Sequence, residues 1–449
     1  MRTTFGASFG ALCLLSVLVW SLQPKAEKPG RVTLVRLSDT NNLRVAQDDL
    51  FVNRNPSFDL QLDPTAGGVE AVIVQSIGGV GPDLFDCFNP SQLSAYVRSG
   101  IAWDVGDELA RRGIDIRRDC FPGILNTAIF DGKIYGVPTN IAADGIWFHK
   151  DLFREAGIPN HSGPWKWSEF IPIAEKLTQR DRQGRPIRYG FYFDWWNFGH
   201  FFKGFGARLF NEDGTRCTVD SPQAIAAVQL MWDLVYKYRV ASTPVEEASM
   251  ATSGGFGSGN ISVFGSKHAA MALGGRWWLA QLRKYKDLDI GVMESPFQSE
   301  RRFHAYGRAT LINKDSPRRE QALQFLLYMA GPDYNRLVNS QADGVCAFRK
   351  YANAPDFLFN PDYPRETDNA IWRVITENAE GDETSPFVNG QVVNRVMNDQ
   401  LDLVKSNQKS PTRAMRDAAA EINREMAKGL AGDPALAERY RKALEEEKR

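Results

Sequence analysis

The chain has 449 residues, of which 54 are Lys or Arg and 54 are Asp or Glu, so its formal net charge is zero. This balance provides no long-range attraction toward nucleic acid or an anionic membrane surface, and no nucleic-acid partner is expected. The length corresponds to about two or three domains, and the absence of a repeat of about 20–50 residues excludes solenoids and propellers.

The N-terminus predicts export. Arg2 is followed by an uncharged stretch, residues 3–23, that is rich in Leu, Val, Phe and Trp. An apolar run of about 18 residues lies between the core of a secretory signal and a minimal membrane span. No Ala-x-Ala cleavage site follows it, and Cys13 lies too early for lipid attachment. We therefore interpret residues 1–30 as a signal peptide, or a membrane anchor if uncleaved, plus a linker. Both alternatives place the protein in the periplasm or on the extracellular face of the cytoplasmic membrane.

Strand and helix patterns alternate after this segment. In chain order they are strands at 32–37 and 58–62, a helix at 67–77, a strand at 82–85 and a helix from about residue 90. Such alternation predicts a parallel α/β lobe, in which ligands bind beyond the carboxyl ends of the strands. Ser38, Asp39 and residues 86–89 follow two of these strands and therefore lie at a predicted cleft rim.

Residues 130–159 predict the connection between two lobes. Asp131-Gly132 is a tight-turn signal, because glycine accepts the positive φ of such turns. A short strand follows and ends at Pro138, and a second strand, residues 145–149, runs into a helix that stops at Gly157. A hairpin, a crossing segment, a strand and a helix are the order expected where a chain leaves one lobe and enters another.

Helical patterns dominate the second half of the chain. The predicted helices are at 167–178, at 221–238 and at 316–331, the last with Pro near its start and Gly at its end. Residues 433–449 are a charged helical extension, interpreted as a solvated face or a frayed tail.

Several stretches resemble, in order, a known family. They are DGKIYGVP followed by KDLFREAGIP, then PWKWSEFIPIAEKLT, LFNEDGTRCTVDSPQAIAAVQLMWDLV and FGSKHAAMALGGRWW. As a set they are similar to the extracellular solute-binding proteins of bacterial ABC importers, in the maltose-binding-protein-like sugar-binding family (family 1). The resemblance runs from about Val32 to Leu430. Ala347 stands where the family usually has Pro, and His149 where it usually has Asn.

This resemblance implies a two-lobed α/β periplasmic-binding-protein fold with a hinge and a ligand cleft between the lobes. The N-terminal lobe is expected from residues 31–141 and 262–314, and the C-terminal lobe from 142–261 and 315–430. The charged helical tail, 431–449, follows. Three crossings between the lobes would form the hinge, and such lobes close on a ligand as near-rigid bodies.

Aromatic residues are the first candidates for ligand contact. Sugars present C–H faces that stack on large rings, whereas their hydroxyl groups need bidentate polar partners. Trp195 and Trp196 lie in the aromatic stretch YFDWWNFGHFF, and Trp277 and Trp278 follow a Gly-Gly turn at the position where the family presents a stacking Trp. Because neighbouring Trp residues usually split, one ring of each pair is expected in the core and one in the cleft.

Polar candidates come from strand ends and from the family-like returning segments. They are Asp86, Asn89, Asn140, Asp144, Arg276, Tyr306, Arg308 and Arg349. Each has an alternative interpretation: Asx residues beside strand ends are often turn formers or helix caps, Asp144 is equally suited to the hinge, and Arg349 to the surface.

Enzyme and metal motifs are weak. The Gly-x-Ser-x-Gly match at residues 6–10 lies in the export segment, and the glycines of residues 255–259 lack the spacing of a nucleotide loop. The five histidines show no metal spacing, so no metal or cofactor is expected. Four cysteines beyond the export segment allow the pairs Cys87–Cys120 and Cys217–Cys346, or four isolated thiols.

The sequence therefore predicts an exported monomer that captures a mono- or oligosaccharide by hinge closure and delivers it to the transmembrane subunits of an ABC importer. Three alternatives stay open. The first is a receptor for a glycerol phosphodiester or another polar solute, favoured if Arg276, Arg308 and Arg349 converge. The second is an extracytoplasmic glycan-cleaving enzyme, which needs two carboxyl groups across the cleft. The third is a membrane-anchored sensor subunit that signals to a kinase.

Overall fold

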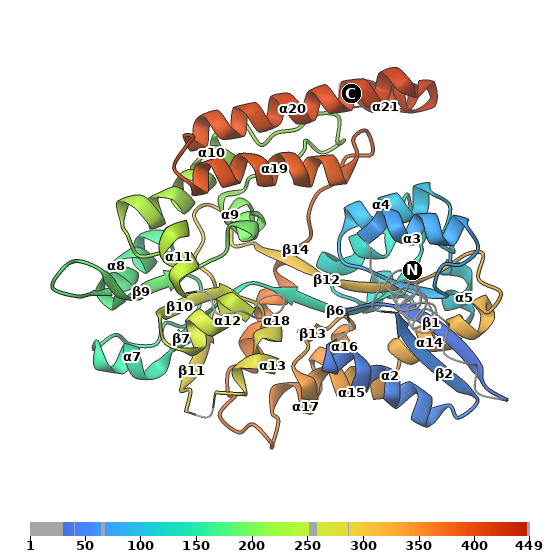
Figure 1. The fold of residues 1–449 in the computed structure, drawn as a ribbon, viewed down its shortest axis with the longest axis horizontal. Helices are drawn as coiled ribbons and strands as arrows, with labels where there is room; N and C mark the ends of the chain where they lie inside the picture. The colour runs from blue at the N-terminus through green and yellow to red at the C-terminus, as the bar shows by residue number, and fades with distance from the viewer. Residues whose placement is uncertain (1–29, 40, 64–67, 251–257, 286, 447–449) are drawn as a thin grey trace, which may run out of the picture.

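A computed structural model describes residues 30–39, 41–63, 68–250, 258–285 and 287–446. The export segment therefore lies outside the described residues. The molecule has two lobes, each built on its own β-sheet, and a layer of long helices above them (Figure 1). The predicted two-lobed α/β fold with a hinge is confirmed.

The first lobe, lobe I, is built on a seven-stranded sheet with the order β13-β6-β12-β3-β1-β2, in which β14 pairs with the start of β12. Its strands are β1 (Val32–Leu37), β2 (Phe58–Asp63), β3 (Leu84–Cys87), β6 (Gly136–Ala143), β12 (Phe303–Ile312), β13 (Val345–Cys346) and β14 (Ala379–Glu380). β1 is parallel to β2 and β3, as the alternating pattern predicts, whereas β12 is antiparallel to β3 and β6.

Lobe I is covered by helices from both ends of the chain. They are α2 (Asn42–Arg54), α3 (Gly68–Ile77), α4 (Pro90–Arg98), α5 (Gly106–Arg111), α6 (Ile116–Asp119), η1 (Pro122–Thr127), α14 (Arg319–Met329), α15 (Pro332–Gln341), α16 (Arg349–Ala352) and α17 (Pro355–Leu358). Asn41 and Asn89 begin α2 and α4 by accepting backbone N–H groups that the first helical turn leaves unpaired. A two-stranded hairpin, β4 (Ile129–Phe130) and β5 (Lys133–Ile134), turns at Asp131-Gly132, where both residues have positive φ.

The second lobe, lobe II, is built on a five-stranded sheet with the order β11-β7-β10-β9-β8. Its strands are β7 (Gly145–His149), β8 (Gln179–Arg180), β9 (Pro186–Tyr192), β10 (Ala269–Gly274) and β11 (Ile290–Met293). Its helices are α7 (Lys150–Glu155), α8 (Trp167–Leu177), η2 (Trp195–Asn197), α9 (Phe198–Phe205), α10 (Pro222–Trp232), η3 (Asp233–Lys237), α11 (Pro244–Met250), α12 (Ser258–Gly265), η4 (Arg276–Trp278) and α13 (Leu279–Leu282).

The remaining helices join or cap the lobes. They are α18 (Asn369–Glu377), α19 (Gly390–Lys405), α20 (Pro411–Gly432) and α21 (Pro434–Glu446). α18 packs against strands of both sheets, so it supports the hinge from one side. α19 and α20 pack on lobe II through a buried apolar stripe, and α21 is an ordered continuation of this layer rather than a frayed tail. No helix among the described residues is long and apolar enough to span a membrane.

The strand pairing corrects the predicted division of the chain. Residues 262–314 were expected in the N-terminal lobe, but β10 and β11 pair with β7 and β9 in the sheet of lobe II. The segment 315–430 was expected in the C-terminal lobe, but α14 and α15 pack on the sheet of lobe I. A short, fully buried strand such as β10 carries no local signal of which sheet it joins, because that choice is made by distant partners.

The four described cysteines are buried free thiols. Of the two alternatives left by the sequence, the structure therefore has isolated thiols and not the pairs Cys87–Cys120 and Cys217–Cys346.

Candidate ligand site between the lobes

The hinge carries a buried carboxylate. Asp144 lies between β6 and β7, where the chain first passes from lobe I to lobe II, and it is 0% exposed. Its two oxygens accept hydrogen bonds from the Tyr306 hydroxyl at 2.9 Å and from the Asn197 side-chain amide at 3.0 Å. Burial raises the pKa of Asp144 to about 6, although these hydrogen bonds and the nearby His304 favour its charged form.

Two indole rings border the same Tyr306. Trp277 donates its ring N–H to the Tyr306 hydroxyl at 3.0 Å, and the Trp196 ring meets the Tyr306 ring edge to face at 5.6 Å. Trp196 is 39% exposed, and Trp277 is half-buried. A side chain at Gly275 would lie 2.9 Å from the Tyr306 hydroxyl, so the Gly-Gly turn is what admits this close approach. We call Asp144, Trp196, Asn197, Trp277 and Tyr306 the hinge cluster.

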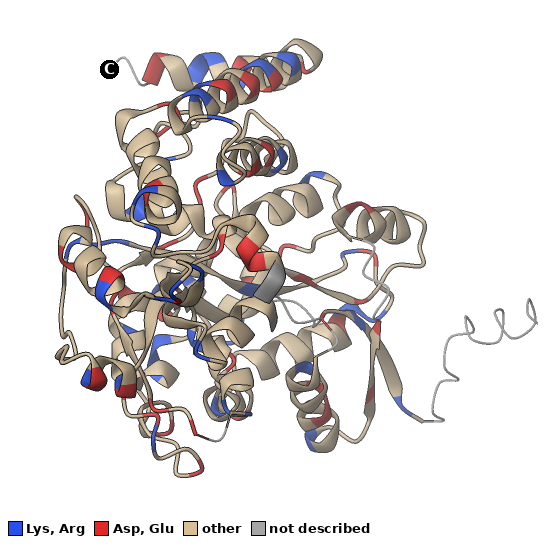
Figure 2. Ribbon diagram, turned by 60° about the vertical axis from the view of Figure 1, so that its left-hand side comes forward, with Lys and Arg blue, Asp and Glu red and all other residues tan. Residues whose placement is uncertain are grey.

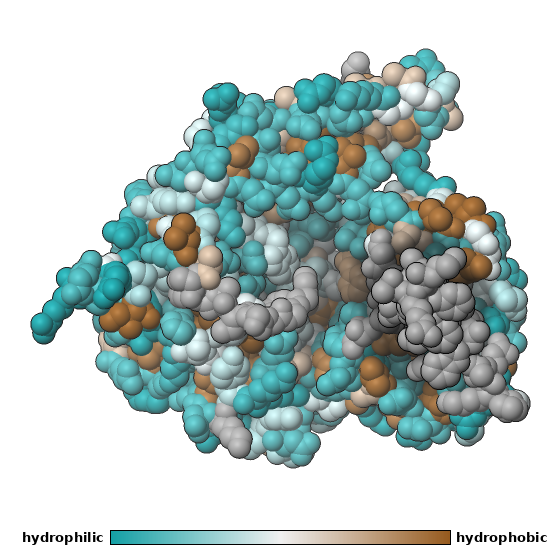
Figure 3. Space-filling view, viewed as in Figure 1, coloured by the Kyte–Doolittle hydropathy of each residue, from teal (hydrophilic) through white to brown (hydrophobic). Residues whose placement is uncertain are grey.

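A cavity of about 360 Å³ lies between the lobes, and its lining residues do not include the hinge cluster. Lobe I contributes Asn89 and the β4–β5 hairpin, lobe II contributes Leu209 and the start of α19, and the segment 382–388 forms a further wall. Asp382 connects the cavity to the hinge, because it accepts a hydrogen bond at 2.8 Å from His304, whose ring lies 5.8 Å from that of Tyr306. Figure 3 shows the surface hollowed between the two halves of the molecule.

The rim of lobe I is a network of buried ions. Arg36 and Arg308 both contact Asp86, at 3.2 and 3.3 Å, and Thr310 donates to its second oxygen at 2.6 Å. Burial alone would raise the pKa of Asp86, but the two guanidinium groups outweigh it and hold the pKa below its usual range. Asp343, paired with Arg44 in the same network, has its pKa lowered to about 2 by that cation despite burial.

The structure distributes the twelve predicted residues unevenly. It brings Asp144, Trp196, Trp277 and Tyr306 together at the hinge and places Asn89 at the cavity wall, where it also caps α4. Asp86 and Arg308 lie in the buried ion network of lobe I, and their charged groups are already satisfied. Asn140 donates to the Asp343 carbonyl oxygen at 3.0 Å, while its own side-chain oxygen is buried without a partner among the described residues.

Four predicted residues lie elsewhere. Trp195 and Trp278 are 6% and 3% exposed and belong to the apolar core. Arg276 is 1% exposed and joins η4 to lobe I by donating to the Gly344 carbonyl at 2.7 Å, and burial lowers its pKa to about 10. Arg349 lies near the surface against Glu377.

The sequence-based site residues do not include three polar residues: Asn197, a member of the hinge cluster, and His304 and Asp382 beside it. Asn197 directly follows the two predicted Trp residues, so its position in the same stretch was a usable signal. His304 and Asp382 lie 78 positions apart and form their pair only through the pairing of β12 with β14. Burial alone would lower the pKa of His304. The charge and the hydrogen bond of Asp382 outweigh burial, so the pKa of His304 is raised. Among the described residues, no group of His, Cys, Asp and Glu is arranged to hold a metal ion.

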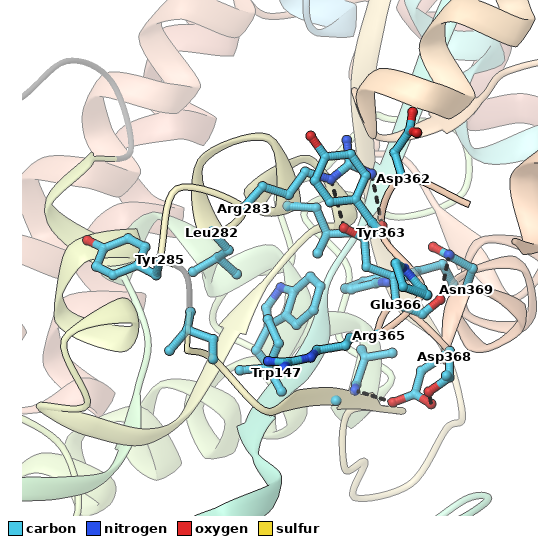
Figure 4. Close-up of a pocket in the computed structure, with 18 residues that line it drawn as sticks. Trp147, Leu282, Arg283, Tyr285, Asp362, Tyr363, Arg365, Glu366, Asp368 and Asn369 are labelled. Carbon is cyan, nitrogen blue, oxygen red and sulfur yellow. Dashed lines mark hydrogen bonds and ion pairs between the residues drawn. The ribbon is translucent and has the colours of Figure 1, made fainter. Parts of the chain in front are cut away.

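A second cavity, of about 240 Å³, lies behind the hinge and contains none of the twelve predicted residues (Figure 4). Its floor is the Trp147 and Trp372 pair, 2% and 1% exposed, which therefore offers a ligand little surface. Its polar wall is already paired, because Arg283 contacts Glu366 through two hydrogen bonds and lies 3.7 Å above the Tyr363 ring. The cavity between the lobes, which Asp382 connects to the hinge cluster through His304, is the better candidate.

The family of the chain follows from comparison with known proteins. Residues 45–336 match the family model of the bacterial extracellular solute-binding proteins, and the chain belongs to this family. Curated relatives include a putative binding protein of Brucella abortus, 26% identical over 200 residues, and an uncharacterized lipoprotein of Streptomyces antibioticus, 25% identical over 344 residues. The first match covers 41% of this chain and only 44% of the Brucella protein, whereas the second covers 72% of both chains.

Solved structures show the same fold at low sequence identity. An ABC substrate-binding protein from Listeria monocytogenes in complex with cycloalternan is 19% identical, with a TM-score of 0.74, and covers 88% of this chain and 99% of its own. UgpB from Mycobacterium tuberculosis, in complex with glycerophosphocholine, is 16% identical, with a TM-score of 0.72, and covers 89% and 99%. The fold therefore accommodates both a sugar and a phosphodiester.

Proposed function

We propose that the protein binds a carbohydrate between its two lobes and delivers it to the transmembrane subunits of an ABC importer. The observation that carries the proposal is the hinge cluster, in which Trp196 and Trp277 border the Tyr306 hydroxyl and the Asp144 carboxylate. Aromatic faces beside fixed hydrogen-bonding groups are the combination that a pyranose ring requires.

Each part of the cluster would have a distinct task. The half-buried Trp277 and the exposed Trp196 would stack on the C–H faces of a sugar, because neither ring is enclosed by the core. Asp144 and Asn140 would fix hydroxyl groups, since a buried carboxylate and an unpartnered amide oxygen accept hydrogen bonds strongly. Two other predicted ligand residues, Asp86 and Arg308, would act indirectly by holding the rim of lobe I in place.

Closure of the lobes about Asp144 would be the mechanical step. A ligand that contacts both lobes has a higher affinity for the closed form, and only this difference shifts the population toward closure. No chemical step and no cofactor is needed, and we propose that the protein is a binding protein and not an enzyme. It would act as a monomer outside the cytoplasm, and the N-terminal segment would serve as its signal or anchor.

A phosphodiester remains the second candidate, because UgpB binds glycerophosphocholine on the same fold. The three arginines expected to converge on such a ligand have separate partners instead. Arg276 binds carbonyl oxygens of lobe I, Arg308 binds Asp86, and Arg349 binds Glu377. The carbohydrate is therefore the better-supported ligand.

A thermal-shift screen tests the proposal. The full chain is heated with mono-, di- and oligosaccharides and with glycerophosphocholine, and a ligand that binds only the folded state raises the midpoint, by about 2.7 kcal/mol of stability at a hundredfold excess over Kd. We expect a saturable shift with one sugar class and at least tenfold weaker binding, about 1.4 kcal/mol, in Trp277→Ala and Trp196→Ala.

Trp232→Ala is the matched control, because Trp232 stacks on Tyr236, donates to Asn407 between α19 and α20 and lies outside the hinge cluster. It should leave the shift unchanged. A shift with glycerophosphocholine alone would favour the second candidate, and equal losses in all three variants would reject the hinge cluster as the site.

A further inference from the structure

The cavity behind the hinge has a mainly apolar wall (Figure 4). Its aliphatic part comes from Leu279 and Leu282 of α13, from Leu288, and from Ile290 and Val292 of β11. The paired polar groups of this cavity are a disadvantage for a sugar, which needs free hydrogen-bonding partners. They are no disadvantage for an apolar ring, because burying such a ring releases water and leaves no polar group of the ligand unpaired.

Two tyrosines form the outer part of this wall and are held in place by their neighbours. Tyr285 and Tyr363 both line the cavity, and each is 37% exposed. The Tyr285 ring packs so closely on Gly265 of α12 that a methyl group there would lie 2.6 Å from it. The Tyr363 ring is covered on one face by the Arg283 guanidinium, at 3.7 Å, which Glu366 holds through two hydrogen bonds. A wall fixed in this way loses little conformational freedom when a ligand binds.

A cation without an ion pair completes the lining. Arg365 is exposed, lines the cavity and forms no ion pair within the described part of the chain. Figure 4 shows its side chain directed toward Trp147 and that of Asp362 directed away, and the nearby Asp368 is paired with Lys150 at 3.1 Å. Figure 2 shows basic and acidic residues interspersed along the described chain. Attraction for an anion at this cavity is therefore local and comes from Arg365.

We propose that this cavity is a second ligand site, which takes up a small aromatic carboxylate. The ring enters between the aliphatic wall and the tyrosines, where edge-to-face contacts with aromatic neighbours favour it, and the carboxylate pairs with Arg365. The volume of about 240 Å³ suits a single substituted ring, since an apolar cavity of about 150 Å³ is enough for benzene. This site shares no residue with the hinge cluster, so the proposal goes beyond carbohydrate binding.

Two probes that differ mainly in charge test this site on the full chain. 4-Ethylbenzoate carries the ring and the carboxylate, and 4-ethylbenzamide keeps the same shape without the charge. Isothermal titration calorimetry at pH 7 measures both dissociation constants. We expect saturable binding to one site, with the benzoate bound about threefold more tightly than the benzamide, because an exposed ion pair contributes only weakly.

Two variants locate the bound probe. Arg365→Ala removes the charge from an exposed loop, so both probes should bind with equal affinity. Leu288→Trp fills part of the cavity from a half-buried position, so both probes should bind about tenfold more weakly, and its melting temperature checks that it is folded. Arg182→Ala is the matched control, because Arg182 is an exposed arginine in the loop between β8 and β9, outside the cavity. It should keep the preference for the benzoate.

The second site is overturned if neither probe binds, or if the two probes bind the unaltered chain equally well. A preference for the benzoate that persists in Arg365→Ala, or undiminished binding to folded Leu288→Trp, would show that the probe binds elsewhere. Tighter binding of hexanoate than of 4-ethylbenzoate would contradict the aromatic ligand. No sugar is present in these measurements, so the second site and the proposed function can fail separately.

Discussion

The two lobes are stabilised in their interiors by opposite chemistry. Around the carboxyl ends of β1 and β3, lobe I contains a buried network of three cations and three anions: Arg36, Arg44, Arg308, Asp48, Asp86 and Asp343. The corresponding interior of lobe II is aromatic and includes Trp165, Trp167, Phe170, Phe191, Phe193 and Phe201, with ring centroids about 5–6 Å apart.

This difference shows where ligand selectivity can arise. The charged side chains of lobe I pair with one another. They therefore hold the strand ends in place and offer few hydrogen bonds to a ligand. The aromatic series of lobe II runs from Phe191 through Phe193 to Trp195 on one side of an extended chain and ends beside the exposed Trp196. Lobe II and the hinge therefore supply the available surface, and lobe I supplies a rigid frame.

The largest effect is expected from removing an anion of lobe I. Asp86→Ala leaves Arg36 and Arg308 buried with fewer partners, and breaking a buried ion pair on one side costs about 3–5 kcal/mol, here near the upper end because two cations are affected. Urea unfolding at neutral pH measures the loss. Asp39→Ala, at the half-exposed edge of the same network, is the control and should cost much less.

The loss should also depend on pH with a defined sign. The folded-state pKa of Asp86 lies below its unfolded value, so its contribution is present above that value, about 3.8, and is lost as the pH falls through the lower folded-state pKa. The difference in stability between the wild type and Asp86→Ala should therefore shrink in acid. A difference that stays constant down to pH 3 would show that packing, and not charge, is what Asp86 provides.

The aromatic counterpart in lobe II should behave differently. Phe170 is fully buried and packs against Trp167 and Phe191, so Phe170→Ala should cost about 3–5 kcal/mol through lost burial and the cavity left behind. Because no titrating group is involved, this loss should not change between pH 4 and pH 7. Urea unfolding at both pH values provides the contrast with Asp86→Ala, and a pH-dependent loss would contradict the division between the lobes.

The sequence predicted much of this fold, because the family-like stretches from Asp131 to Trp278 occur in their usual order. The sequence could not assign β10 and β11 to a sheet, since a buried strand has the same apolar pattern in either lobe. Trp195 and Trp196 are successive residues of η2, a helix with three residues per turn, so their side chains point about 120° apart, which is a local property. Arg276 was placed in the cleft wrongly, because its partners, the carbonyl groups of Asn339 and Gly344, are brought together only by the fold.

An effect of intermediate size is expected at the hinge residue Asp144. The hydrogen-bond donors to its carboxylate, Tyr306 and Asn197, are neutral groups and not cations. Burial raises the folded-state pKa of Asp144 from 3.8 to about 6, so the fold favours its neutral form. That contribution is complete below about pH 4 and is lost as the pH rises through 6. Asp144→Asn should therefore raise the free energy of unfolding at pH 7 by up to about 3 kcal/mol and change it little at pH 4.

The same variant separates stability from binding. An amide in place of the carboxylate still accepts the Tyr306 hydrogen bond but weakens the acceptor offered to a ligand hydroxyl, so sugar-induced thermal shifts should fall while the melting temperature rises. Asp362→Asn, on an exposed loop, is the control for a change of one charge. A fall in stability at pH 7 would show that ionised Asp144 is held by its hydrogen bonds more strongly than burial opposes it.

The smallest effect is expected from an arginine at the surface of lobe I. Arg349 is about one-third exposed, contacts Glu377 at 3.4 Å and lies over the Phe121 ring, so Arg349→Ala should cost about 0–1 kcal/mol and leave ligand-induced shifts unchanged. Arg308→Ala, the same change at a 1% exposed position, should cost several-fold more because Asp86 loses one of its two cations. Equal losses in urea unfolding would mean that burial does not distinguish the charges of lobe I, and the ionic frame would then not explain its rigidity.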